Sequence, residues 1–150
     1  MITIKEAFML LRIATPADID TIYEITKTSL GYDYPKDLMK EQLLTIISSP
    51  HDLLTVATIN QEVVGYVHGA YYLTFYSPAL VNILALAVAK DQQGKGLGKA
   101  LMTHIEAWAK ERNAKGVRLN SGAEREAAHL FYESVGYTKV KYQANLRKLF

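Results

Sequence analysis

An apolar strand, a glycine-rich turn and a helix follow one another over residues 80–112, and this order constrains the fold most. Residues 80–89 are almost uniformly apolar, which predicts a strand buried on both faces. Gly94, Gly96 and Gly98 come next and free the backbone to turn its N–H groups inward. The following helix adds its own unpaired N–H groups and the positive end of its dipole. Together these elements predict a site for a phosphate or a pyrophosphate.

Two common phosphate-binding loops fail on particular residues of this segment. The dinucleotide fingerprint needs a glycine at position 99, where the chain has Lys99. A Walker A loop needs a glycine where Gln93 stands and a serine or threonine where Ala100 stands. The spacing therefore excludes both loops and leaves the hexapeptide at residues 93–98 as a motif of another kind.

This hexapeptide, Gln-Gly-Lys-Gly-Leu-Gly, resembles the Gln/Arg-x-x-Gly-x-Gly/Ala signature of the GCN5-related N-acetyltransferase family. Ala128, Tyr132 and Gly136 are similar to a second block of that family, Ala-x-x-x-Tyr-x-x-x-Gly-Phe/Tyr. The resemblance implies that the loop binds the pyrophosphate of acetyl-CoA. It also implies that Tyr132 is the catalytic acid, because a CoA thiolate leaves poorly at neutral pH unless a nearby O–H donates to it. Taken without the family, a ligand-free turn and a packed tyrosine are the alternative interpretations.

The resemblance also implies contacts along the rest of the coenzyme. Pantetheine would bind the backbone at residues 86–88 like an added strand, and an N–H there would polarise the thioester carbonyl. Small alanines in this strand allow close approach of a ligand, although they suit close helix packing equally well. Arg125 either contacts a CoA phosphate or pairs with a neighbouring glutamate. The implied cofactor-binding residues are Leu86, Ala87, Val88, Gln93, Gly94, Lys95, Gly96, Leu97, Gly98, Lys99, Asn120, Arg125, Ala128 and Tyr132.

The chain departs from the family at the expected general base. Many relatives carry a glutamate on the fourth strand, where this chain has Asn82, and an amide cannot act as a base. His68, Tyr71, Tyr72 and water held by backbone carbonyls remain as alternatives, each of which also suits a core or surface role.

The remaining pattern predicts a mixed α/β domain spanning residues 1–150. Strands are expected at 8–14, 53–59, 63–72, 80–89 and 117–121, with two closing strands in 137–150. Helices are expected from 15 to 30, around 38–47, from 97 to 112 and from 124 to 134, the last ended by Gly136. The crossover from strand 80–89 to strand 117–121 should be parallel. The resemblance implies the acyl-CoA N-acyltransferase fold, a mostly antiparallel sheet with one parallel, splayed strand pair and helices on both faces.

Composition narrows the classes of partner. The chain has 150 residues and a formal net charge of +2 with no run of like charges, which argues against nucleic acid or a membrane as the main partner. The absence of cysteine excludes disulfides and a cysteine nucleophile and favours a cytoplasmic protein. The four histidines are scattered, so no metal site is expected.

The sequence therefore predicts an N-acetyltransferase that moves an acetyl group from acetyl-CoA, its cosubstrate, to a primary amine by direct attack. The alternatives are a non-catalytic acyl-CoA-binding module and an acetyltransferase acting on a protein N-terminus or lysine. The amine, on a small molecule or a peptide, would bind where aromatic side chains gather in residues 29–37 and 66–76. The same surface would serve a homodimer interface equally well. Its members are Tyr32, Tyr34, Tyr66, Tyr71, Tyr72, Phe75 and Tyr76.

Overall fold

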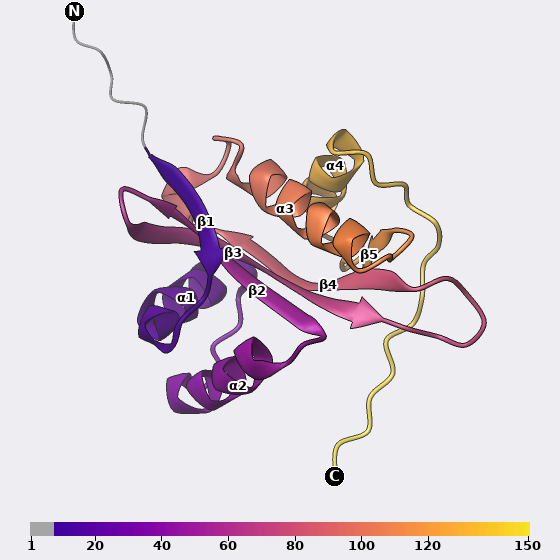
Figure 1. Cartoon of the computed structure of the whole chain (residues 1–150), viewed down its shortest axis with the longest axis horizontal. Helices are drawn as coiled ribbons and strands as arrows, with labels where there is room; N and C mark the ends of the chain where they lie inside the picture. The colour runs from indigo at the N-terminus through magenta and orange to yellow at the C-terminus, as the bar shows by residue number, and fades with distance from the viewer. Residues whose placement is uncertain (1–7) are drawn as a thin grey trace, which may run out of the picture. The chain divides into compact units, whose positions relative to one another are not determined.

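The computed structural model describes residues 8–150. Its contacts divide the chain into two units, the first ending at Leu119 and the second beginning at Asn120. Within the described residues, the first unit holds one five-stranded sheet of order β1-β2-β3-β4-β5 (Figure 1). Pairing is antiparallel from β1 to β4 and parallel between β4 and β5, which confirms the predicted fold class. The strands are β1 (Met9–Ile13), β2 (Asp52–Ile59), β3 (Glu62–Tyr72), β4 (Leu80–Val88) and β5 (Val117–Leu119).

Helices cover both faces of this sheet. In Figure 1, α1 (Ile19–Ile25) and α2 (Lys36–Ser48) lie on one face, and α3 (Leu97–Glu111) lies on the other. A 3-10 turn (Pro16–Asp18) leads into α1, and a π-helical turn (Thr26–Leu30) continues it to Gly31, whose φ of 79° ends the helix as predicted. The core beneath α1 and α2 contains Ile22, Ile25, Leu43, Leu54, Val56, Tyr66 and Ala87.

A partly buried ion pair links β1 to the turn before α1. The Asp18 carboxylate accepts two guanidinium N–H groups of Arg12, at 2.8 and 2.9 Å, and the backbone N–H of Thr15 at 2.8 Å. The hydrogen bonds from Arg12 are the main reason that the pKa of Asp18 lies below its usual range, and they raise the pKa of Arg12 in turn. The charges therefore fix the angle at which the chain leaves the sheet.

β4 departs from the prediction at Leu84. The register with β3 changes from His68↔Ala85 to Gly69↔Ile83, so Leu84 is the extra residue of a β-bulge. Its side chain is 57% exposed, and the predicted burial on both faces is therefore wrong at this position. The bulge bends the strand and turns this leucine out of the pleat, an effect that an apolar run cannot reveal.

The second unit contains α4 (Glu126–Ser134), which ends as predicted. Gly136 has a φ of 98°, the N–H of Tyr137 donates to the carbonyl of Tyr132 at 2.9 Å, and the N–H of Gly136 donates to the carbonyl of Glu133 at 3.1 Å. This is a Schellman motif, which satisfies the last carbonyls of the helix.

The two closing strands predicted in residues 137–150 are wrong: among the described residues, no strand follows Leu119. Alternation holds only over residues 139–142 and is then interrupted by Gln143 and Asn145. A strand also needs a hydrogen-bonding neighbour, and this segment buries little apolar surface that would hold it against one. Its apolar side chains Val140, Tyr142, Leu146, Leu149 and Phe150 are exposed.

Candidate functional site

The loop before α3 presents unpaired backbone N–H groups. Gly94 and Gly96 have φ values of 77° and 85°, which non-glycine residues rarely adopt. The first helical hydrogen bond runs from the N–H of Ala100 to the carbonyl of Gly96 at 3.0 Å, so the amides of residues 97–99 precede the ladder. No side chain of the described residues caps this end of α3, and its first turn holds no acidic residue. The geometry suits a bound anion.

Two polar side chains of the loop form hydrogen bonds with nearby residues of the chain. Gln93 Nε2 donates to the carbonyl of Val88 at 3.1 Å, and Lys95 Nζ donates to Gln92 Oε1 at 3.0 Å. These hydrogen bonds support the shape of the loop, and Lys99 is exposed beside it.

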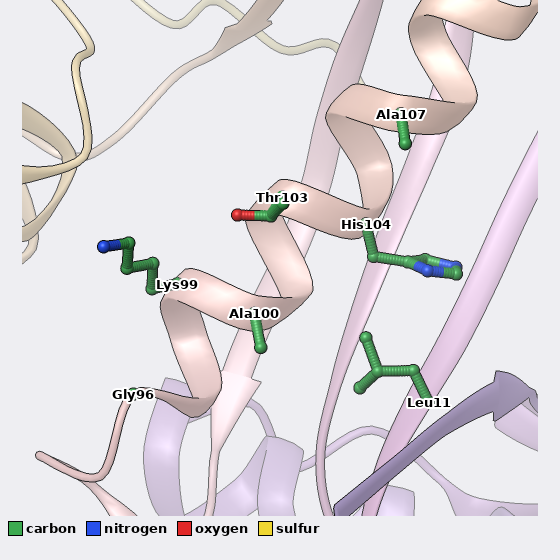
Figure 2. Close-up of a pocket in the computed structure, with 7 residues that line it drawn as sticks. All are labelled: Leu11, Gly96, Lys99, Ala100, Thr103, His104 and Ala107. Carbon is green, nitrogen blue, oxygen red and sulfur yellow. The ribbon is translucent and has the colours of Figure 1, made fainter.

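A hollow of about 470 Å³ lies along the side of α3 next to Leu11 of β1. Figure 2 shows the His104 ring on the same side of α3 as Leu11, whereas Lys99 points to the opposite side. Most of the lining is apolar, so the hollow suits a diphosphate poorly even though it includes two residues of the loop. Its lining residues are Leu11, Gly96, Lys99, Ala100, Thr103, His104 and Ala107.

The far half of β4 offers an open backbone edge. The parallel ladder with β5 covers only Val81 to Ile83, so among the described residues no strand pairs with residues 84–88 on that side. An extended ligand can add to such an edge as a strand. The Ala87 side chain, however, lies in the core under α1, which favours the helix-packing interpretation of the alanines. The Val88 carbonyl accepts hydrogen bonds from Ser29 Oγ at 2.9 Å and from Gln93.

Two polar pairs connect neighbouring strands, one between β4 and β5 and the other between β2 and β3. Arg118 Nη1 donates to Asn82 Oδ1 at 2.6 Å, and the Arg118 guanidinium lies 4.6 Å from the centre of the Tyr72 ring. Asp52 Oδ1 and His68 Nε2 are 2.8 Å apart. Sequence reasoning missed Asp52 and Arg118, because strand register alone brings each to its contact.

One residue of the predicted aromatic surface, Tyr66, is buried in the structure. Tyr66 is 5% exposed, and its hydroxyl lies 2.7 Å from Thr26 Oγ1, so it belongs to the core. Burial raises its pKa. Tyr32, Phe75 and Tyr76 are exposed and remain available to an acceptor or to another protein surface.

In the second unit, Ala128 and Tyr132 share one face of α4, as their spacing predicts. Burial raises the pKa of Tyr132, and the charge of Arg125 opposes that rise. The Tyr132 ring packs edge-on against Phe131 and Tyr137, at centroid distances of 5.2 and 5.9 Å. A phenol that keeps its proton at neutral pH can serve as a general acid.

Arg125 and Asn120 flank this helix on its N-terminal side. Arg125 is exposed directly before α4, and within residues 8–150 it forms no ion pair with Glu124 or Glu126. The structure therefore does not support the alternative in which Arg125 pairs with a neighbouring glutamate. Asn120 is exposed at the start of the unit.

A sequence model described as the acetyltransferase (GNAT) family matches residues 19–137. The N-alpha-acetyltransferase of Sulfolobus acidocaldarius is 29% identical over 139 residues, which cover 87% of this chain and 80% of that protein. The 5-NmdU N-acetyltransferase of Pseudomonas phage PaMx11 is 28% identical over 131 residues, which cover 87% of both chains. A structure of the aminoglycoside N-acetyltransferase AAC(6')-Iy in complex with CoA shares the fold, with a TM-score of 0.88 at 13% identity over 98% of this chain and 99% of the other.

The family match defines the class of protein, an acetyltransferase. Because the match covers well over half of its residues, the chain belongs to the acetyltransferase (GNAT) family, which confirms the predicted family and enzyme class. Among the described residues, no helix is long and apolar enough to cross a membrane.

Proposed function

We propose that this chain is a single-domain, cytoplasmic N-acetyltransferase that moves the acetyl group of acetyl-CoA to a primary amine by direct attack. The observation that carries the proposal is the N-terminus of α3, where two glycines of positive φ precede amides that no side chain caps. Such amides, with the helix dipole behind them, fit the diphosphate of the coenzyme. The family and the CoA complex of a protein with the same fold support this choice of ligand.

Each of the implied cofactor-binding residues has a role in this proposal. Residues 93–99 hold the diphosphate, mainly through their amides. The open edge of β4 at residues 86–88 holds pantetheine, and a backbone N–H there polarises the thioester carbonyl. In this proposal we assign to Tyr132 the proton of the released thiol, to Ala128 the space beside the phenol, and to Asn120 and Arg125 contacts with the coenzyme phosphates. The lack of cysteine supports direct attack over an acyl-enzyme.

The test is release of free thiol from acetyl-CoA by the purified protein across a panel of amines. The panel contains an aminoglycoside, a polyamine, amino acids, a lysine peptide and peptides with free N-termini. We expect release above the hydrolysis background with at least one amine. Binding of acetyl-CoA without any transfer would instead favour the non-catalytic module, and activity on the peptides alone would favour a protein acceptor.

The role of Tyr132 is tested by Tyr132→Phe, which removes only the hydroxyl. We expect kcat to fall by about a hundredfold, in the range of a lost general acid, with little change in acetyl-CoA affinity. Phe131→Leu, on the neighbouring ring, is the matched control and should leave kcat within about twofold. An unchanged kcat in Tyr132→Phe would remove the phenol from the reaction.

A further inference from the structure

Asp52 and His68 form a hydrogen-bonded pair on the face of the sheet that α1 and α2 cover. The two side chains are 21% and 14% exposed. His68 is two residues from Tyr66, whose ring belongs to the core beneath these helices, so alternation puts both side chains on that face. His68 therefore lies two residues beyond the core residue Tyr66 along β3, where its side chain is still partly exposed to water.

The carboxylate determines which ring nitrogen of His68 can take up a proton. An ionised Asp52 only accepts hydrogen bonds, so Nε2, at 2.8 Å, must donate. A neutral imidazole then keeps its lone pair on Nδ1, and no group of the described residues hydrogen-bonds to that atom. A histidine oriented by a carboxylate, with its second nitrogen open, has the arrangement of a general base.

Strand register puts His68 beside the part of β4 that the proposed function assigns to the thioester. Its Cα partner is Ala85, which directly follows the bulge residue Leu84. From this point on, β4 has lost its pairing with β5. Cross-strand neighbours have Cβ atoms about 5 Å apart, so the imidazole lies beside Ala85 of β4, and a water can relay a proton from there towards the open edge.

The other candidates for the base are less suitable. Tyr71 is the cross-strand partner of Val81, whose side chain lies next to Gly69 on the face of the sheet that α3 covers. The Tyr71 side chain therefore points to the face opposite Asp52 and His68. The Tyr72 ring lies against the Arg118 guanidinium, and the Asn82 amide accepts a hydrogen bond from the same arginine. Among these side chains, only the imidazole combines a basic lone pair with a fixed orientation.

We infer that His68 is the general base of the acetyl transfer and that Asp52 is its positioning residue. The inference rests on the proposed function. An alkylammonium group has a pKa of about 10 and must lose a proton before its nitrogen can attack a thioester. Nδ1 of His68 takes that first proton and later releases it to water. The C–N bond forms and the C–S bond breaks, Tyr132 gives its proton to the sulfur, and the second amine proton restores the phenol.

The test compares two acceptors of different basicity with the wild type and His68→Gln. Glutamine can still donate to Asp52 but has no basic nitrogen. At neutral pH we expect transfer to an alkylamine to fall by about a hundredfold in this variant. Transfer to a hydrazide, which is already unprotonated at neutral pH, should stay within about threefold of wild type. The affinity for acetyl-CoA, measured by calorimetry, should not change.

Asp52→Asn and His51→Gln complete the design. Asp52→Asn can offer an N–H to the ring and so favour the wrong tautomer, and we expect the same selective loss with the alkylamine. Long-range proton–nitrogen spectra of the neutral ring should show Nε2 protonated in the wild type and a changed tautomer ratio in Asp52→Asn. His51→Gln, an exposed histidine next to Asp52, should behave as wild type.

The outcomes separate this inference from the proposed function. If the wild type transfers acetyl to no amine, the proposed function fails and the inference fails with it. If the wild type is active and His68→Gln affects both acceptors equally, or neither, only the inference is overturned. If His68→Gln does not fold, equal losses with the two acceptors in Asp52→Asn would overturn the inference instead. A neutral His68 ring protonated on Nδ1 in the wild type would also overturn it.

Discussion

Gly96 and Gly31 share a backbone conformation but differ in what depends on it. Their φ values are 85° and 79°, and a Cβ added to either glycine would meet no atom within 4 Å. Gly31 ends the helical segment before α2, whereas Gly96 sets the direction of the amides at the start of α3. Substitutions at the two positions therefore cause similar backbone strain, but only a substitution at Gly96 also affects the proposed binding site.

We expect Gly96→Ala and Gly31→Ala to lower the free energy of unfolding by a similar amount, about 1–2 kcal/mol, because both place a Cβ in the left-handed region. Only Gly96→Ala should weaken acetyl-CoA binding, by roughly fivefold if one amide contact is lost. Denaturant titration and calorimetry measure the two quantities. Equal affinity in the two variants would show that the loop does not hold the coenzyme.

At the scale of elements, β3 and α3 are in unusually close contact at Gly69. A Cβ at this position would lie 2.7 and 2.8 Å from the Cδ1 and Cγ1 atoms of Ile105 and 3.2 Å from Val81. Ile105 is fully buried, so it has no room to move away. Glycine in this strand therefore allows the helix to approach the sheet, rather than forming a turn.

We expect Gly69→Ala to destabilise the protein by about 1–3 kcal/mol through overpacking. Ile105→Val removes the closer methyl group, so the double variant should be more stable than the sum of the single effects by at least about 0.5 kcal/mol. Gly116→Ala is the control, since its Cβ would meet only Leu80 at 3.3 Å. Urea unfolding of the four variants measures the differences, and strict additivity would contradict the contact.

Element boundaries followed the sequence closely wherever a local signal existed. Asn60 and Gln61 join β2 and β3 with φ values of 50° and 71°, the two positive angles of a type I′ hairpin turn. Gly31 and Gly136 end their helices as predicted. The prediction of two closing strands was wrong because no such local signal exists there. A strand depends on a distant neighbour, which no local pattern in residues 137–150 specifies.

For the whole molecule, a coenzyme that binds only the native state must raise its stability. At a ligand concentration one hundred times Kd, the gain is about 2.7 kcal/mol. For a chain of this size each kcal/mol raises Tm by about 2–4 °C. Acetyl-CoA should therefore raise Tm by several degrees, as measured by calorimetry or fluorescence.

Fragments of the coenzyme serve as controls for this shift. Desulfo-CoA retains the diphosphate and should raise Tm almost as much as acetyl-CoA, whereas pantetheine alone should have a small effect. A larger shift with pantetheine than with desulfo-CoA would contradict the diphosphate site at α3.

The sequence by itself determined what short-range chemistry controls. The glycines at 94 and 96, the spacing of Ala128 and Tyr132 and the apolar periodicity of the helices act within a few residues, so the loop, the helix face and the parallel crossover were predictable. The tertiary structure decided what depends on register between distant segments: the bulge at Leu84, the hydrogen bond from Arg118 to Asn82, and the pairing of Asp52 with His68. A side chain's chemistry is local, but its neighbour across a sheet is set by packing the whole core.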